Sequence, residues 1–435
     1  MAADVTIGRE RLTAHPLRAA VLGEVHARPF TPIETPRRVL HFAFETTPEL
    51  GEADRAALAA FCASRALAEP PKGAKHHRVV FGTTALRWEQ HSEFTTYTWE
   101  LPSETADGTP FHPGAATLAE PMSLIPQPGP VLVAIDLHLV ADTGKIAPER
   151  LFDRASLAAA ENSDSTALYA TDFQSDPAGF VRILIADRGL GAERAGALTQ
   201  RVLEIETYRV LALLGLPEAQ RLAPAVRRIE IRLAEVTAQT RGAQGLEANQ
   251  RLLEELTTLA AELEAGAAAS QFRFGASRAY DQIVAQRLQT IGERKSGGLP
   301  TWTSFLARRM APAMRTCSTL EERQAKLAEK LARAANLLRT RVDVELEQQN
   351  RDVLRSMNER TRLQLMLQAT VEGLSVAAIS YYVVGLFGYL VKGLHDAGLI
   401  RVDPSLATGA FVPVAVLLVW WIVRRIRSRH IKGVG

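Results

Sequence analysis

Two long uncharged stretches near the carboxyl end constrain this chain more than any other feature of its sequence. They cover residues 373–391 and 404–423, and neither contains an Asp, Glu, Lys or Arg. As a helix, each is about as long as the ~20 residues that cross the hydrocarbon core of a bilayer. Two buried core helices are the alternative, but Trp420 and Trp421 stand where interfacial anchors are expected. A basic cluster follows them, which is typical of the cytoplasmic end of a span: Arg424, Arg425, Arg427, Arg429 and Lys432.

The charges around the two stretches predict their orientation. Arg360 and Arg362 precede the first stretch and the basic cluster follows the second, whereas residues 392–403 balance basic against acidic side chains. Lys and Arg near the ends of spans stay in the cytoplasm. We therefore expect two spans with both termini in the cytoplasm, a short outer loop, and the lipid bilayer as a partner.

Composition limits the remaining classes of protein. The chain has 435 residues, of which 47% are hydrophobic and 23% charged, so it has enough apolar surface for two or three folded domains. Lys and Arg number 51 against 48 Asp and Glu, which is too balanced to suggest a nucleic-acid partner. The two cysteines, Cys62 and Cys317, exclude a disulfide framework and a four-thiolate zinc site.

Residues up to about 188 have the pattern of a mixed α/β domain. A helical pattern over residues 53–68 separates segments rich in β-branched and aromatic residues, which predict strands. We expect helices packed on a sheet, and the pattern does not predict the strand order. The predicted strands cover residues 37–45, 78–82, 85–100, 131–140 and 180–187.

Beyond residue 188 the periodicity is helical, and one helix is unusually long. Ser318 and Glu321 have the spacing of a capping box, and no Gly or Pro follows until Gly373. A helix over 319–391 would be roughly 110 Å long, which suits a coiled stalk in a homo-oligomer. A break near Asn350 is the alternative. One apolar stripe marks the helix: Leu327, Leu331, Ala334, Leu338, Val342 and Leu346.

Together these patterns predict an α+β/α membrane protein, with an N-terminal mixed α/β cytosolic domain, a long helical stalk and two C-terminal transmembrane helices. The expected parts are the cytosolic domain at 1–188, a helical region at 189–315, the stalk at 316–371, spans at 372–392 and 404–423, an outer loop at 393–403 and a basic cytoplasmic tail at 424–435.

Histidine and carboxylate side chains of the first domain are the candidates for a metal or acid–base site. If residues 85–100 form one strand, Glu89, His91 and Glu93 share a face, and Asp136 and His138 do so on a later strand. Carboxylate and imidazole together could bind a divalent metal, or act as acid and base. A turn through residues 90–92 would separate them, and a solvated polar face is the simpler interpretation. No other cofactor and no catalytic residue is predicted.

Three further features have a functional and a structural interpretation. Glu24, His26 and Arg28 could bind an anion or nucleotide, or tie the amino terminus to the sheet. Neither cysteine has a base nearby in the sequence, and the chain has no P-loop, no G-x-G-x-x-G after a strand and no zinc-ligand spacing.

The third feature is the most polar face of the first span, which could line a water-filled path or pack against another helix. Neither span contains Asp or Glu, and Lys392 in a ring at the outer mouth would repel cations. Steps of three and four place these residues on that face: Ser375, Ala378, Tyr382, Gly385, Tyr389 and Lys392.

Several segments resemble a bacterial family of uncharacterised membrane-anchored proteins, domain-of-unknown-function family 3422. They are His-Pro-Leu-Arg at 15–18, Glu-Val-His-Ala-Arg-Pro-Phe at 24–30, Arg-Trp-Glu-Gln-His-Ser-Glu-Phe at 87–94, and most of 345–390. The resemblance implies placement in the inner, cytoplasmic membrane and no established activity. The layout also resembles CorA-type magnesium channels, in which five copies assemble. Their Gly-Met-Asn signature is absent, because residues 385–392 read Gly-Leu-Phe-Gly-Tyr-Leu-Val-Lys.

Three functions remain open at this point. The first is a homo-oligomer that transports small ions, including metal cations, through its two spans. The second is a non-conducting membrane-anchored scaffold or sensor whose cytosolic domain binds a partner or ligand. The third is an enzyme that uses Glu89, His91 and Glu93.

Overall fold

The computed structural model describes residues 4–7, 10–13, 15, 17–18, 21–22, 30–103, 109–112 and 120–431. The chain divides into two compact units, which are Met1–Ala238 with Glu255–Ala334, and Gln239–Glu254 with Ala335–Gly435.

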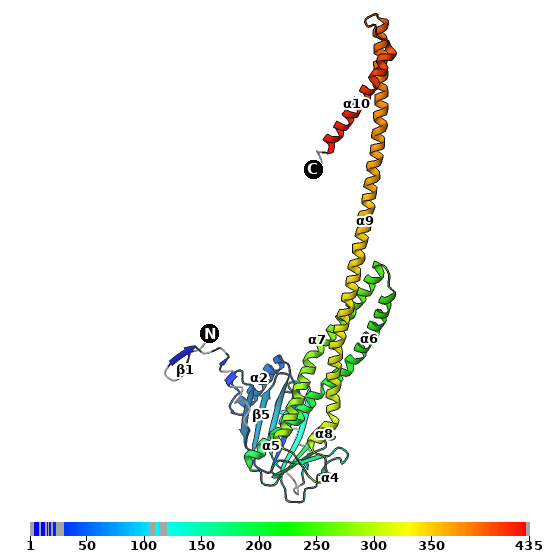
Figure 1. Ribbon diagram of the computed structural model, residues 1–435. Coiled ribbons are helices and arrows are strands. Elements are labelled where there is room, and N and C mark those ends of the chain that lie inside the picture. The colour runs from blue at the N-terminus through cyan, green and yellow to red at the C-terminus, as the bar shows by residue number, and fades with distance from the viewer. Residues whose placement is uncertain are drawn as a thin grey trace. The chain divides into compact units, whose positions relative to one another are not determined.

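A mixed sheet of nine strands forms the centre of the first unit, in the order β11-β8-β9-β10-β7-β3-β6-β5-β4 (Figure 1). Only β10 and β7 pair in parallel, and every other neighbouring pair in this order is antiparallel. A separate hairpin joins β1 (Asp4–Ile7) to β2 (Glu10–Thr13). The strands of the large sheet are β3 (Arg37–Glu45), β4 (His76–Phe81), β5 (Thr84–Gln90), β6 (Phe94–Pro102), β7 (Val131–Ala141), β8 (Ala158–Glu161), β9 (Ala167–Thr171), β10 (Val181–Asp187) and β11 (Arg294–Lys295).

Helices cover both faces of this sheet, so its central strands are buried on both sides. On β3, Val39 and Ala43 join the core under α5 (Ala192–Leu213), while Leu40 and Phe42 point to the opposite core under α2 (Pro48–Ser64). This alternation follows from the two-residue period of a strand. The remaining helices are α3 (Glu120–Ser123), α4 (Pro148–Leu151), α6 (Gly215–Gly242), α7 (Leu246–Ile291), α8 (Trp302–Arg309), α9 (Ala311–Asp396) and α10 (Pro404–Ile431).

Most predicted strands are confirmed, and one is wrong. Strands β3, β4, β7 and β10 match the expected segments within a few residues. Residues 85–100 instead form the hairpin of β5 and β6, because the chain turns at 91–93, where the amide of His91 donates to the carbonyl of Phe94 at 2.8 Å. The expected boundary between residues 188 and 189 falls between β10 and α5, inside the first unit.

The long helix α9 starts earlier than predicted and has no break. It begins at Ala311, so Ser318 lies inside the helix and its hydroxyl donates to the carbonyl of Arg315 at 3.1 Å. The predicted start at Ser318 is therefore wrong. Asn350 also lies within the continuous helix, so the alternative of a break there is wrong too.

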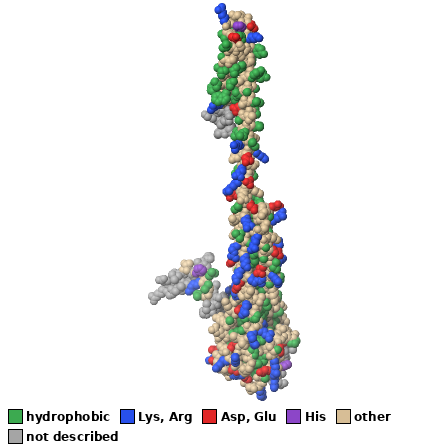
Figure 2. Space-filling model, turned by 45° about the vertical axis from the view of Figure 1, so that its right-hand side comes forward, with side chains coloured by type: hydrophobic (Ala, Val, Ile, Leu, Met, Phe, Trp, Pro, Cys, Tyr) green, Lys and Arg blue, Asp and Glu red, His purple; other side chains and the backbone are tan. Residues whose placement is uncertain are grey.

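In the second unit, the apolar carboxyl-terminal part of α9 packs against α10. The Phe387 and Phe411 rings stack with centroids 3.9 Å apart, and a Cβ built on Gly388 would lie 3.3 Å from Thr408 Cγ2. Each helix contains a window long and apolar enough to cross a membrane. Figure 2 shows hydrophobic side chains gathered on the surface of these helices.

Candidate functional site

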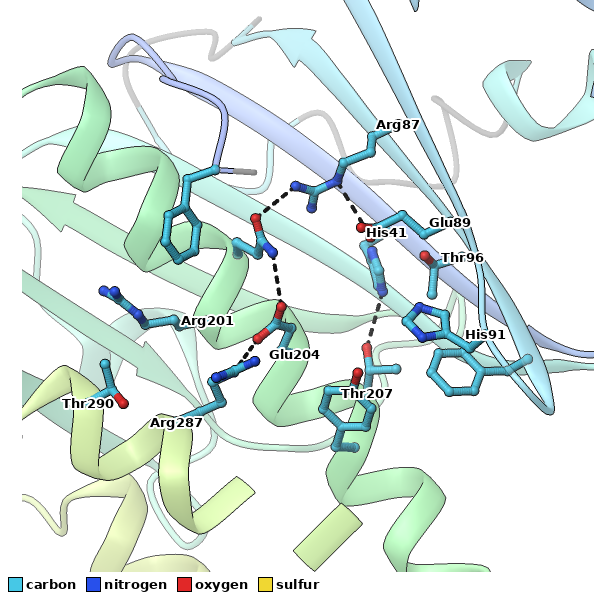
Figure 3. A pocket seen from close by; sticks show the side chains of 14 residues that line it. His41, Arg87, Glu89, His91, Thr96, Arg201, Glu204, Thr207, Arg287 and Thr290 are labelled. Atoms are coloured by element: carbon cyan, nitrogen blue, oxygen red, sulfur yellow. Dashed lines mark hydrogen bonds and ion pairs between the residues drawn. The ribbon is translucent and has the colours of Figure 1, made fainter. Parts of the chain in front are cut away.

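A polar pocket of about 300 Å³ lies between the sheet and two helices of the first unit (Figure 3). Strands β3, β5 and β6 form its floor, and α5 and α7 form its walls. Its lining residues are Phe30, His41, Arg87, Glu89, His91, Phe94, Thr96, Gln200, Arg201, Glu204, Thr207, Tyr208, Arg287 and Thr290.

The local sequence places these side chains by simple periodicity. On β5, Arg87 and Glu89 are two residues apart and so point to the same face of the sheet. On α5, Gln200, Glu204 and Thr207 follow at steps of four and three and so share one face of the helix. The pocket is formed where these two polar faces meet.

A chain of charge-assisted hydrogen bonds crosses the pocket. Arg87 Nη1 donates to Gln200 Oε1 at 3.0 Å, and Gln200 Nε2 donates to Glu204 Oε1 at 3.0 Å. Arg287 Nε donates to the other carboxylate oxygen of Glu204. Arg87 Nε lies 3.7 Å from Glu89 Oε2, so Glu89 is the nearest counter-charge on the sheet side.

The pocket still holds unused hydrogen-bonding capacity. The side chain of Arg87 is only 10% exposed, yet its Nε has no hydrogen-bond partner among the described residues, and neither does Thr96 Oγ1. The guanidinium of Arg201 lies 5.2 Å from the centre of the Phe30 ring and forms no ion pair with the described residues. Buried polar atoms without partners are uncommon, so this arrangement has room for a hydrogen-bonding ligand.

His41 is held neutral in the pocket wall. Burial, and then the charge of Arg87, lower its pKa to about 3. Thr207 Oγ1 donates to the carbonyl of Leu203 at 2.8 Å, so it accepts from His41 Nε2 at 3.1 Å. His41 Nδ1 therefore accepts from the Thr98 hydroxyl at 2.8 Å. Since His41 carries no charge, three guanidinium groups face two carboxylates.

Comparison with known proteins then places the chain in a family. Residues 13–430 match the family described as "Protein of unknown function (DUF3422)". The chain belongs to this family. No curated protein and no solved structure matches it. The predicted family is thus confirmed, and the further likeness to CorA-type channels stays a prediction.

The structure separates the predicted metal and acid–base candidates of this DUF3422 protein. Glu89 and His91 line the pocket. The His91 ring stacks on the Phe94 ring, with the ring centroids 4.0 Å apart. Glu93 instead binds α7, where it accepts from Arg273 Nη2 at 2.5 Å and from the Tyr280 hydroxyl at 2.6 Å. Among the residues that the structure describes, no group of three or more His, Cys, Asp or Glu is placed to hold a metal ion.

Asp136 and His138 belong to a different, buried cluster on β7. Arg38 Nε and Nη2 donate to the two oxygens of Asp136 at 2.8 and 2.6 Å. Although burial raises the pKa of Asp136, the neighbouring His138 and the hydrogen bonds from Arg38 hold it below its usual value. Burial lowers the pKa of His138, whose Nε2 lies 3.4 Å from Asp136 Oδ1. This cluster binds the neighbouring strands β3 and β7 together.

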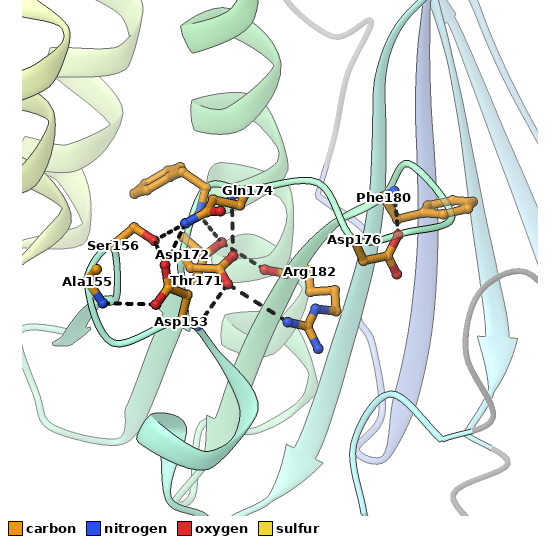
Figure 4. Close-up of polar contacts among 10 residues, drawn as sticks. Asp153, Ala155, Ser156, Thr171, Asp172, Gln174, Asp176, Phe180 and Arg182 are labelled. Carbon is orange, nitrogen blue, oxygen red and sulfur yellow. Dashed lines mark hydrogen bonds and ion pairs between the residues drawn. The ribbon is translucent and has the colours of Figure 1, made fainter.

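Acidic side chains near β9 and β10 form a second polar cluster (Figure 4). Asp172 accepts from the backbone amides of Asp153 at 3.1 Å and Gln174 at 3.2 Å. Arg182 Nη2 lies 3.8 Å from Asp172 Oδ2, and the Arg182 guanidinium carbon lies 5.4 Å from the centre of the Phe111 ring. Gln174 Nε2 also donates to Asp153 Oδ2 at 2.9 Å, so the cluster ties the loop after α4 to the loop after β9.

Two other candidate groups have simple outcomes. Glu24, His26 and Arg28 lie outside the described residues.

Both cysteines are buried. Burial is the main cause that raises the pKa of Cys62 and of Cys317, so their thiols are neutral and weakly nucleophilic at pH 7.

The predicted polar face of α9 does not pack against α10. Gly388 and Phe387 contact α10, whereas the polar face lies on another side of α9. Ser375, Ala378, Tyr382, Tyr389 and Lys392 are exposed, and Gly385 is half-buried.

The helical half of the pocket was not predicted from the sequence. Gln200, Arg201 and Glu204 belong to α5, and Arg287 and Thr290 belong to α7. Arg287 is 83 positions from its partner Glu204, so no local motif links them. The spacing of Gln200, Glu204 and Thr207 on one helix face was the available signal, since it places polar residues where a helix should pack.

Proposed function

We propose that this protein is anchored in a membrane by two helical spans and uses its sheet domain to bind a small anionic ligand. The pocket carries the binding half of the proposal: three arginines face two glutamates and a neutral histidine. Guanidinium groups match carboxylate and phosphate oxygens in geometry and charge. Binding an anion would therefore balance the pocket and satisfy its remaining donors.

The pocket walls suggest that the ligand also carries a flat ring. Phe30 lines the same cavity as the arginines and is 52% exposed, so its ring can stack on a planar group, whereas His91 already stacks on Phe94 and Tyr280 on Tyr208. A volume of about 300 Å³ is at the lower end of the usual range for small-molecule sites. A ring-bearing monophosphate or carboxylate fits this combination of chemistry and size.

Exposed apolar surface supports the membrane half of the proposal. Leu386, Tyr389 and Leu417 are each more than 60% exposed on the two apolar helices. Soluble proteins rarely expose contiguous apolar patches of this kind, and lipid is the environment that would cover them. We assign the spans to 373–391 and 404–423 in the inner membrane, with both termini in the cytoplasm, since the basic cluster follows the second span.

Ligand binding is tested on the purified full chain in detergent, with inorganic phosphate and AMP as probes. We expect both anions to raise the melting temperature, AMP more than phosphate. Arg201→Gln should weaken binding about tenfold or more, because a charge-assisted hydrogen bond contributes about 1.5–3 kcal/mol. Arg333→Gln, on exposed α9, is the matched control and should bind normally. Failure of both anions to stabilise the chain, or unchanged binding by Arg201→Gln, contradicts the proposal.

Ion transport is a second candidate, favoured by the exposed polar face of the first span. Tyr382 and Ser375 on that face provide hydroxyl groups that could contact water or ions. The absence of Asp and Glu from both spans and the position of Lys392 weigh against a cation path. Flux of Mg²⁺ and K⁺ into liposomes that contain the purified protein decides the matter, because no flux of either ion removes this candidate.

A further inference from the structure

The exposed part of α9 before the first span lacks any cover in the described chain. Every residue from 346 to 371 is exposed. Large apolar side chains are among them, including Val353, Met357, Leu367 and Val371, and the side chain of Leu367 is 71% exposed. A helix of this length standing alone in water gains no stability from tertiary packing.

These apolar side chains form a row with the repeat of a coiled coil. From Leu346 the row continues through Val353, Met357, Leu367 and Val371 at steps of three and four, and the polar side chains of Asn350, Arg360 and Gln364 occupy the remaining positions of the same row. This is the heptad pattern, which places residues along one seam of a helix. Asn350, Arg360 and Gln364 interrupt the apolar seam, and polar residues at such positions set the register of paired helices at a cost in stability.

The row continues an interface that the chain itself already buries. Val342 and Leu338 precede Leu346 on the same row, at successive steps of four residues. Their side chains are buried, at 7% and 1% exposed. Within the second unit, Arg341 Nη1 donates to the carbonyl of Thr240 at 2.7 Å, and Asn249 Nδ2 donates to Glu345 Oε1 at 2.8 Å. Residues 239–254 thus pack on α9 at this level, and beyond it the same seam lacks a partner in the described chain.

Past Val371 the seam enters the apolar stretch of α9. Ala378, Tyr382, Gly385 and Tyr389 follow at steps of four, three and four, on a side of the helix that α10 does not contact. The side chain of Tyr382 is 71% exposed. A phenol hydroxyl in hydrocarbon needs a hydrogen-bond partner, and small residues such as Ala378 and Gly385 allow close approach of a second helix.

We propose that this seam is the surface on which a second copy of the chain pairs, as a parallel coiled coil of α9 helices that continues into the membrane. A partner must present side chains at the same spacing along both the part of α9 before the first span and the span itself. A second copy of α9 has this spacing because its sequence is identical. Two copies inserted in the same direction are necessarily parallel, which brings Asn350 opposite Asn350 and Tyr382 opposite Tyr382. The part within the span rests on the anchoring proposed above, whereas the part from 346 to 371 does not.

Cysteine cross-linking of the full chain in its native membranes tests the seam. Val353→Cys, Leu367→Cys and Tyr382→Cys place thiols on the seam, and Arg355→Cys and Ala369→Cys place them on the opposite side at matching levels. Native Cys62 and Cys317 are buried and so should stay unreacted. We expect mild oxidation to shift the three seam variants to dimers on non-reducing gels and to leave both control variants monomeric.

The outcomes distinguish this inference from the proposed function. Equal cross-linking on both sides of the helix, or none at positions 353 and 367, overturns the paired seam. Dimers at 353 and 367 in a chain that fractionates without membranes support the seam and contradict the anchoring. Ligand binding does not enter either readout, so its failure leaves the seam unaffected.

Discussion

His41 shows how one buried side chain makes the fold sensitive to pH. Its pKa is lowered to about 3 in the folded state, against 6.5 in an exposed histidine. Between these values the unfolded chain binds a proton that the folded chain does not, so stability is present above pH 6.5 and is lost as the pH falls. The loss reaches up to about 5 kcal/mol below pH 3 if nothing else compensates.

We therefore predict that His41→Gln flattens the acid side of the stability profile. The change removes the titrating group while keeping a side chain that can donate to Thr207 and accept from Thr98. Urea unfolding at pH 7 and pH 4.5 measures the effect. The wild-type chain should lose more free energy of unfolding than the variant over this range, and parallel losses in both would contradict the assignment.

Asp54 is a second residue whose buried contacts make a measurable prediction. Its two oxygens accept from Trp88 Nε1 at 2.7 Å and from the Tyr97 hydroxyl at 2.5 Å. Asp54→Asn keeps one acceptor oxygen and leaves one of these donors unpaired, which should cost about 1–3 kcal/mol of unfolding free energy. Glu52→Gln, exposed on the same helix, is the control and should change it by less than about 0.5 kcal/mol.

At the scale of elements, two glycines of α9 that look equivalent in sequence differ in the structure. A Cβ on Gly388 would meet Thr408 of α10, whereas a Cβ on Gly385 would meet no atom within 4 Å. Gly388→Leu should therefore force α9 and α10 apart at a cost of about 1–3 kcal/mol, and Gly385→Leu should not. The yield of an intrachain disulfide between Phe387→Cys and Phe411→Cys measures this. An equal loss of yield in both glycine variants would contradict the packing.

Local pattern predicted some elements well and others not at all. The β-branched and aromatic residues of Arg37–Glu45 indicate a strand, and β3 forms there. Strand β8 has the sequence AAAE, which carries no strand preference, and it becomes a strand through its pairing with β9. The turn at residues 91–93 contains no Gly, Pro or Asn, so the sequence offers a turn here only as an alternative to one continuous strand.

The wrong predictions for the start of α9 and for Glu93 have the same cause, because both depend on contacts or turns that local spacing does not record. Ser318 and Glu321 have capping-box spacing, yet they lie inside a helix that starts at Ala311, because spacing alone does not exclude a preceding turn of helix. Glu89 and His91 were predicted candidates and do line the pocket, while Arg273 and Tyr280 hold Glu93 away from it. Contacts between segments so far apart in sequence have no local signature.

At the scale of the whole molecule, the proposed membrane anchoring would determine where the sheet domain binds its ligand. A protein held at a membrane would report the level of its ligand at that surface, and paired α9 helices would link two pockets in one assembly. The first of these roles requires the two apolar stretches at 373–391 and 404–423 to be covered by lipid. This requirement can be tested without knowing the ligand.

Extraction of the full-length protein from isolated membranes at alkaline pH is the most direct test. Carbonate releases proteins that are held only by charge, and it leaves those whose helices span the bilayer. We predict that the chain stays in the membrane pellet after carbonate and enters solution only with detergent. Recovery of the intact chain in the supernatant without detergent would contradict the anchoring.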